Sequence, residues 1–206
     1  MSSRSALLKT EYDNKSMLCL SRPSQFQIEQ FIDRLKELPL SYQPTGIARE
    51  FPRGFKVDEA FAVIGHGDAA FARAKQALIN WQQFDLGWVK LFPTHALVET
   101  GTVVAVLVHH LGFWSLNGCR IINVLDNDSD QPAFGFAYGT LTNHAESGEE
   151  IFEVAFNAVS QEVTYRIRAV SKPRAAFAVA SYPVTRLLQS RFRRDSIAAM
   201  KRAVAE

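Results

Sequence analysis

Residues 133–171 read AFGFAYGTLTNHAESGEEIFEVAFNAVSQEVTYRIRAVS, and their alternation predicts the architecture of the whole chain. Large apolar side chains such as Phe134 and Phe136 recur at every second position, which is the period of a β-strand. Ser160-Gln161-Glu162 separates two such runs and predicts a hairpin. This alternation is typical of an antiparallel sheet that turns one face to water.

The chain before this stretch predicts more strands and two helices. Leu97–His109 and Phe113–Leu125 also alternate, and a cluster of turn residues follows the second run. A helix is predicted after Ser24, a strand at Phe55–Val63, and a second helix after Asp68. The strands therefore predominate in the middle of the chain.

A long amphipathic helix is predicted after Lys172-Pro173, with Pro183 suited to a first helical position. Its apolar and basic side chains fall on opposite arcs of the helical wheel. We therefore expect the apolar arc to pack on the sheet and the basic arc to stay outside. The apolar arc holds Val184, Leu188, Phe192, Ala199, Met200 and Ala203, and the basic arc holds Arg186, Arg193, Arg194 and Lys201.

The order of these elements indicates an α+β fold in which a curved antiparallel sheet grips the long C-terminal helix. We divide the chain into an N-terminal extension with one helix, residues 1–45, and a helix-grip domain, residues 46–206. The natural ligand site of this arrangement is a cavity beneath the helix. The small residues Gly135, Ala137 and Gly139 are expected to leave room there.

Composition restricts the class of protein. The chain has 206 residues, 47% of them hydrophobic, which is enough for one domain with a sizeable core. With only Cys19 and Cys119, a reducing compartment is expected. No apolar run reaches the roughly 18 residues of a membrane span, and residues 1–20 have no secretory h-region. These features predict a cytoplasmic protein without a transmembrane segment.

The charge is distributed unevenly along the chain. Residues 172–202 contain eight basic residues and one acid, whereas the residues up to 171 have a net charge of −4. A basic helix of this kind can dock on an acidic partner, or it can be a solvated face. Aromatic side chains are scarce among the basic ones, so nucleic-acid binding is not expected.

Eight stretches, spread over residues 40–204, resemble a family of uncharacterised proteins of bacteria and plants, the domain of unknown function 1990 family. That resemblance implies no established activity. By element order alone, the chain also resembles the START and pollen-allergen superfamily of helix-grip proteins, which implies a hydrophobic ligand but not a reaction. The family's Gly-Ala-Thr-like stretch reads Thr45–Arg49 here. The matching stretches are Leu40–Tyr42 (LSY), Val63–Gly67 (VIGHG), Trp81–Phe84 (WQQF), Asn117–Ile122 (NGCRII), Phe134–Leu141 (FGFAYGTL), His144–Glu150 (HAESGEE), Ser171–Pro173 (SKP) and Tyr182–Phe192 (YPVTRLLQSRF).

The sharpest polar cluster consists of His144, Glu149 and Glu150, on the connection between two predicted strands. A histidine near a carboxylate can act as a general acid/base pair. The alternative is a hairpin held by polar bonds, in which Gly148 supplies the turn. These three residues are the candidates for a catalytic role.

Arg120 lies in an otherwise apolar strand and is the candidate anchor for a ligand carboxylate or phosphate. Alternatively, it pairs with Glu149 or Glu150, or it faces the wet side of the sheet. The other predicted ligand-binding residues are aromatic and would equally suit a plain core. They are Trp114, Phe134, Phe136, Tyr138 and Phe192.

No Walker loop, dinucleotide fingerprint, zinc spacing or nucleophile elbow occurs, so no cofactor or metal site is predicted. The predicted function is to hold a small apolar or amphipathic ligand between the sheet and the C-terminal helix. One alternative is an enzyme that uses His144 with Glu149 or Glu150 in the same cavity. The other is an interaction protein whose basic helix docks on an acidic partner.

Overall fold

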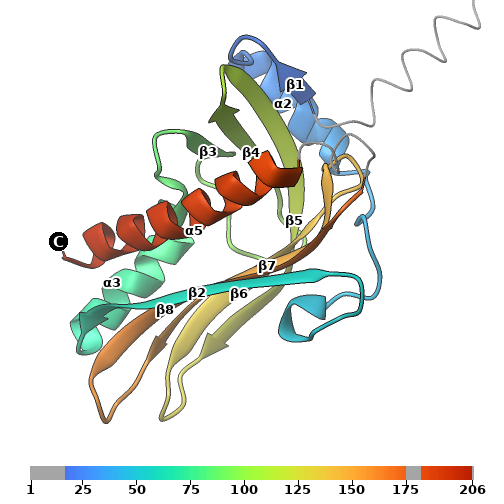
Figure 1. Cartoon of the computed structure of the whole chain (residues 1–206). Helices are drawn as coiled ribbons and strands as arrows, with labels where there is room; N and C mark the ends of the chain where they lie inside the picture. The colour runs from blue at the N-terminus through green and yellow to red at the C-terminus, as the bar shows by residue number, and fades with distance from the viewer. Residues whose placement is uncertain (1–16, 175–181, 206) are drawn as a thin grey trace, which may run out of the picture.

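One curved antiparallel sheet organises the computed structural model, which describes residues 17–174 and 182–205 (Figure 1). Within those residues the strands follow the order β2-β8-β7-β6-β5-β4-β3, and β1 pairs with β5 beside this path. The strands are β1 Met17–Cys19, β2 Lys56–His66, β3 Val89–Phe92, β4 Val103–His110, β5 Phe113–Asn127, β6 Ala133–Thr140, β7 Glu146–Phe156 and β8 Glu162–Pro173.

The strands from β4 to β8 pair antiparallel with their neighbours in sequence, which confirms the prediction from alternation. The strand predicted at Leu97–His109 is shorter than expected, because a turn with Gly101 at φ 96° precedes Val103. β3 was not predicted, since four residues are too few to show a period. β2 closes the other edge by pairing with β8.

Within the described residues, three α-helices and two short 3-10 helices accompany the sheet. The first helix has the predicted capping box, in which Ser24 and Gln27 bond each other's backbone. α3 and α5 lie together across the concave face of the sheet, while α2 packs on β4 from the other side (Figure 1). None of the described helices is long and apolar enough to cross a membrane. The helices are α2 Gln25–Leu35, η1 Ile47–Arg49, α3 Asp68–Ile79, η2 Gln82–Phe84 and α5 Tyr182–Ala205.

The two faces of β6 differ in side-chain size, and this decides what packs on each. Phe134 and Phe136 point toward α3 and belong to the main core. The expectation that Gly135, Ala137 and Gly139 leave room beneath the helix is wrong, because they lie on the opposite face. A Cβ on Gly139 would collide there with the hydroxyl of Tyr42. These small residues therefore allow the segment around Tyr42 to pack closely on the sheet.

α5 has two halves with different surroundings. In its C-terminal half the predicted apolar arc is buried, as Ala199 and Met200 are 5% and 0% exposed. Ser196 is buried with them and shares a hydrogen bond of 2.9 Å with the hydroxyl of Tyr165 on β8. In its N-terminal half, Leu188 and Phe192 are half-buried and face a cavity. The C-terminal half therefore closes the core, and the N-terminal half forms a roof.

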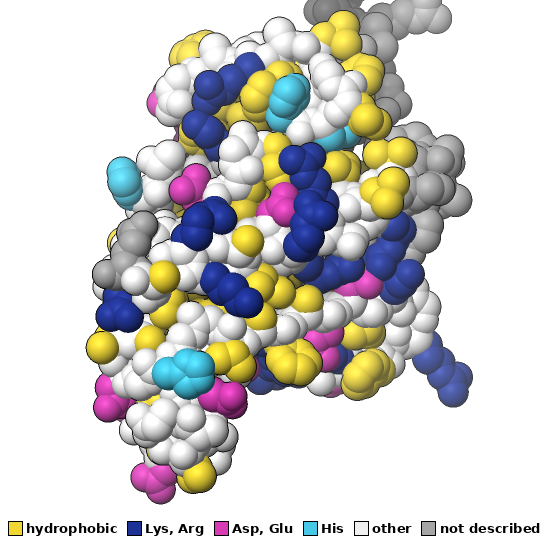
Figure 2. All heavy atoms as spheres, turned by 60° about the vertical axis from the view of Figure 1, so that its left-hand side comes forward, with side chains coloured by type: hydrophobic (Ala, Val, Ile, Leu, Met, Phe, Trp, Pro, Cys, Tyr) yellow, Lys and Arg dark blue, Asp and Glu magenta, His cyan; other side chains and the backbone are white. Residues whose placement is uncertain are grey.

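The basic arc of α5 is only partly outside. The side chain of Arg194 is 75% exposed, as predicted. The side chains of Arg186 and Arg193 are only 21% and 15% exposed, so the expectation that they lie outside is wrong. Both pair with Asp58 of β2, whose side chain is only 12% exposed under the start of the helix and is stabilised there by positive charge. Figure 2, which turns the α5 side of the molecule forward, shows Lys and Arg side chains spread over this face among hydrophobic ones.

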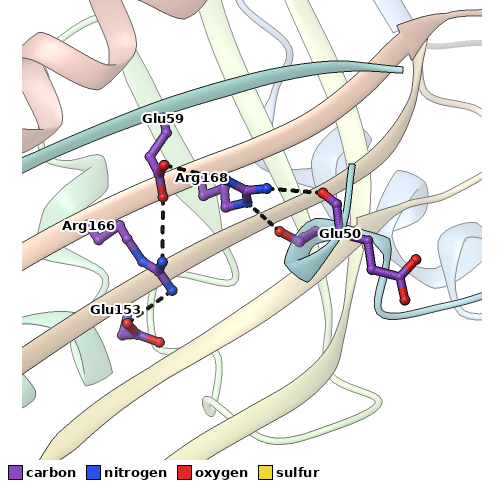
Figure 3. A network of polar contacts seen from close by, with 6 residues as sticks. Glu50, Glu59, Glu153, Arg166 and Arg168 are labelled. Atoms are coloured by element: carbon purple, nitrogen blue, oxygen red, sulfur yellow. Dashed lines mark hydrogen bonds and ion pairs between the residues drawn. The ribbon is translucent and has the colours of Figure 1, made fainter. Parts of the chain in front are cut away.

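A polar network covers the outer face of β8, where the alternation predicted a wet side (Figure 3). The guanidinium of Arg168 donates from Nε to the carbonyl of Ala48 at 2.7 Å and from Nη2 to that of Glu50 at 3.0 Å. Glu59 lies between Arg168 and Arg166, at 3.4 and 3.5 Å. These contacts fix the segment of η1 to the outer face of the sheet.

Candidate ligand cavity

A cavity of about 490 Å³ lies between the concave face of the sheet and the N-terminal half of α5. Ligand sites for small organic molecules have volumes of this order. Its apolar lining comes mainly from α5, β4 and the segment from η2 to β3, and its polar lining comes mainly from the sheet. The apolar residues include Leu18, Phe84, Trp88, Val89, Val106, Val108, Val184, Leu188 and Phe192, and the polar ones include His110, Ser115, Asn117, Tyr138, His144, Glu146, Glu150, Ser171, Gln189 and Arg193.

Glu150 and Tyr138 form the central polar pair of the floor. They are direct neighbours on β7 and β6, and the Tyr138 hydroxyl donates to Glu150 Oε2 at 2.7 Å. Burial raises the pKa of Glu150 to about 7, against the opposing effects of the Tyr138 hydrogen bond and of Arg193. The pKa of Tyr138 is also raised by burial, and the nearby carboxylate adds to this effect. Near neutral pH the pair therefore holds a proton that can be lost or gained.

His144 and Glu146 lie at one end of the cavity, where the chain turns into β7. The backbone N–H of Glu146 donates to His144 Nδ1 at 3.0 Å. Burial lowers the pKa of His144 to about 4, so the imidazole is neutral at physiological pH. The carboxylate of Glu146 accepts from Gln189 Nε2 of α5 at 2.6 Å, and burial raises its pKa.

Glu149 is adjacent to Glu150 in sequence but turns its carboxylate to the outer face. Its oxygens accept hydrogen bonds from the Tyr42 hydroxyl at 2.7 Å and from the backbone N–H groups of Gly46 and Ala48 at 2.7 and 2.8 Å. Glu149 is among the residues that line the cavity, but its carboxylate is bonded to groups on the outer face. The structure therefore separates the predicted catalytic cluster, with His144 and Glu150 at the cavity and Glu149 behind the sheet.

Arg120 does not reach the cavity either. Its Nη2 donates to the carbonyl oxygens of Lys36 at 2.8 Å and Leu35 at 3.5 Å, at the C-terminal end of α2. A cation at this end of a helix satisfies carbonyls that have no partner in the helix. The structure thus gives Arg120 a capping role on the outer face, in place of the expected ligand anchor or pairing with Glu149 or Glu150.

The predicted aromatic residues are divided between cavity and core. Tyr138 and Phe192 line the cavity. Phe136 is 1% exposed and packs edge-on against Trp81 with ring centroids 4.8 Å apart, and Phe134 lies in the same core. Trp114 stacks on His109 at 4.3 Å on the side of α2.

Sequence reasoning missed several lining residues. Asn117 lies on β5 two positions before Cys119, and both line the cavity. Side chains two positions apart share one face of a strand, and this spacing was the one available signal for Asn117. Trp88 carried no such signal. It reaches the cavity because the segment between η2 and β3 folds under α5, where its indole N–H donates to Asp195 at 3.0 Å.

Within residues 17–174 and 182–205, no group of three or more His, Cys, Asp or Glu side chains is arranged to hold a metal ion.

Comparisons with known proteins agree with the fold. A family model described as Domain of unknown function (DUF1990) matches residues 41–199. A UPF0548 protein of Dictyostelium discoideum is 32% identical over 207 residues, which cover 91% of this chain and 96% of that protein. A UPF0548 protein of Arabidopsis thaliana is 31% identical over 154 residues, covering 73% and 74%.

Among solved structures, the Zhui aromatase/cyclase from Streptomyces sp. R1128 superimposes with a TM-score of 0.53 at 13% identity. The match covers 73% of this chain and 94% of that one. At this identity the likeness shows a shared fold alone, and it confirms the predicted curved sheet with a gripped C-terminal helix.

Proposed function

The chain belongs to the family described as Domain of unknown function (DUF1990), and we propose that it binds a small amphipathic molecule in the cavity beneath α5. The observation that carries the proposal is the cavity itself, about 490 Å³ in volume and apolar on one side with polar groups on the other. A protein interior is normally packed without voids of this size. A space of this volume, lined in this way, suits a ligand with an apolar body and a polar end.

The apolar side of the cavity gives a direct test. Nile red is a neutral apolar dye whose fluorescence rises when it leaves water, and we expect it to bind with a stoichiometry of one per chain. Leu188→Trp places a larger side chain in the roof and should abolish binding. Leu187→Trp is the matched control, because Leu187 is the next residue of α5 and is 72% exposed.

Both variants are first checked by thermal melting, so that the comparison is made between folded proteins. Binding that survives Leu188→Trp, or that is lost equally in Leu187→Trp, contradicts a site beneath the helix. Native mass spectrometry of freshly purified protein gives a second measurement, because a ligand acquired in the cell would add a discrete mass.

A second candidate function is acid/base catalysis on a molecule held in this cavity. It is favoured by one observation, the Glu150 carboxyl with its pKa raised to about 7 and 2.7 Å from the Tyr138 hydroxyl. A general acid or base works best with a pKa near the working pH. His144 lines the same cavity as a neutral imidazole. If a substrate is found, Glu150→Gln should reduce turnover while leaving Nile red binding intact.

A further inference from the structure

The carboxyl of Glu150 has an unused oxygen inside the cavity. Its Oε2 accepts the hydrogen bond of Tyr138. Among the residues that the structure describes, this carboxyl has no other hydrogen-bond donor and no Lys, Arg or His within ion-pair distance. The side chain is half-buried, and it lines the cavity. Oε1 is therefore open to whatever the cavity holds.

The charges around this carboxyl do not balance it. Among the described residues, the cation that acts on it is Arg193 of α5, but that guanidinium also lies 3.7 Å from the carboxylate of Asp58. Glu146 adds a second carboxyl on the same strand. The ionisable groups in electrostatic reach are Asp58 on β2, Cys119 on β5, Tyr138 on β6, Glu146 on β7, Tyr165 on β8 and Arg193 on α5.

We infer that the ligand carries a protonated amine, or another cation with N–H donors, which pairs with Glu150 while its apolar body lies beneath α5. This inference rests on the proposed function. A cation supplies both things that the carboxylate lacks, a positive charge and a donor for Oε1. A ligand anion would instead meet Glu146 and Glu150, and a neutral donor would leave the charge of Glu150 offset only by Arg193, which Asp58 shares.

The protonation of Glu150 adds a second signature. Because burial holds its pKa at about 7, the carboxyl carries a proton for part of the time at neutral pH. An ammonium group binds best to the ionised carboxylate, so its binding expels that proton. We therefore expect amine affinity to rise between about pH 6 and pH 8 and then to level off.

Three probes with one naphthyl body test the inference by displacing Nile red. They are 2-(1-naphthyl)ethylamine, 2-(1-naphthyl)ethanol and the carboxylate 1-naphthaleneacetate, which end in a cation, a neutral hydroxyl and an anion. At about pH 8 the amine should bind wild-type protein roughly tenfold or more tightly than the alcohol, as expected for a charge-assisted hydrogen bond. The acetate should bind more weakly than the alcohol.

Glu150→Gln assigns the preference to one side chain, because it removes the charge and keeps the size. In this variant the advantage of the amine over the alcohol should fall to about twofold or less, and its rise with pH should disappear. Glu153→Gln is the matched control, since it makes the same change on β7 but on the outer face, where Glu153 pairs with Arg166 at 3.1 Å. It should retain the full preference for the amine.

The outcomes separate the inference from the function on which it rests. If Nile red binds but wild-type protein prefers the alcohol or the acetate, the inference of a cationic ligand is wrong, while the proposal of ligand binding in the cavity remains. If the amine is preferred equally in Glu150→Gln, the assignment to Glu150 is wrong. Failure of Nile red to bind wild-type protein contradicts the proposed function and the inference together.

Discussion

Replacing Glu149 with glutamine should destabilise the protein without weakening ligand binding. The Glu149 carboxylate accepts three hydrogen bonds of 2.7 to 2.8 Å, from Tyr42, Gly46 and Ala48, and is 3% exposed. A glutamine oxygen can retain the first two donors, but its NH₂ group would face the N–H of Ala48. The variant therefore loses one charge-assisted bond and buries a donor without a partner, at a cost of about 2–4 kcal/mol.

That loss is measurable by chemical denaturation, because a domain has only about 5–15 kcal/mol of stability in total. For a chain of this length it corresponds to a melting temperature lower by roughly 5–15 °C. Glu153→Gln is again the control, since its partly exposed ion pair is worth about 1 kcal/mol or less. Nile red affinity should be unchanged in folded Glu149→Gln. A stability loss no larger than that of Glu153→Gln, combined with lost dye binding, would show that the carboxylate serves the cavity instead.

Three further predictions concern the other charged residues. Arg120→Met should cost about 1–3 kcal/mol, through the lost bonds to the end of α2, and thermal melts with dye titration should show reduced stability but unchanged affinity. Folded Glu150 has a pKa raised from its ordinary 4.5 to about 7, so its contribution to stability is present at low pH and is lost as the pH rises from about 4.5 to 7. Urea denaturation across this range should show the free energy of unfolding of Glu150→Gln rising relative to that of wild type as the pH increases. A constant difference between the two proteins over this pH range would contradict the prediction. Arg193→Glu should destabilise the protein by more than about 1 kcal/mol, because it places a carboxylate beside Asp58. The exposed control Arg194→Glu should change stability by no more than about 0.5 kcal/mol. Equal melting temperatures of the two variants would contradict the pairing of Arg193 with Asp58.

The alternation was sufficient to predict strands β2 and β4 to β8, but not the short strands β1 and β3 and not the side on which the helix docks. On β8, for example, the alternation predicts Tyr165 and Ile167 on the face opposite Arg166 and Arg168, and the structure agrees. On β6 both faces are apolar, so periodicity could not say which one the helix covers. The large aromatic face lies under the helices, and the face with Gly139 lies under the segment around Tyr42.

The functional residues were harder to predict because their partners are distant in sequence. Arg120 bonds carbonyls 84 and 85 positions earlier, and backbone carbonyls leave no mark in the amino-acid sequence. Arg193 was assigned to solvent because a helical wheel shows charge but not depth. Its partner, Asp58, lies far earlier in the sequence, on β2, which pairs with β8 at the edge of the sheet.

Two neighbouring carboxylates on β7 give the clearest physical argument for a ligand. Successive side chains of a strand point to opposite faces, so Glu149 and Glu150 meet different surroundings at the same level of the sheet. The first is saturated by three donors and has a structural role. The second has one donor, a raised pKa and an open oxygen, which is an unfavourable state for a half-buried carboxyl. Polar groups left in such a state occur at functional sites, where a bound molecule supplies the missing partner. The contrast therefore supports the proposal that the polar end of a ligand pairs with Glu150.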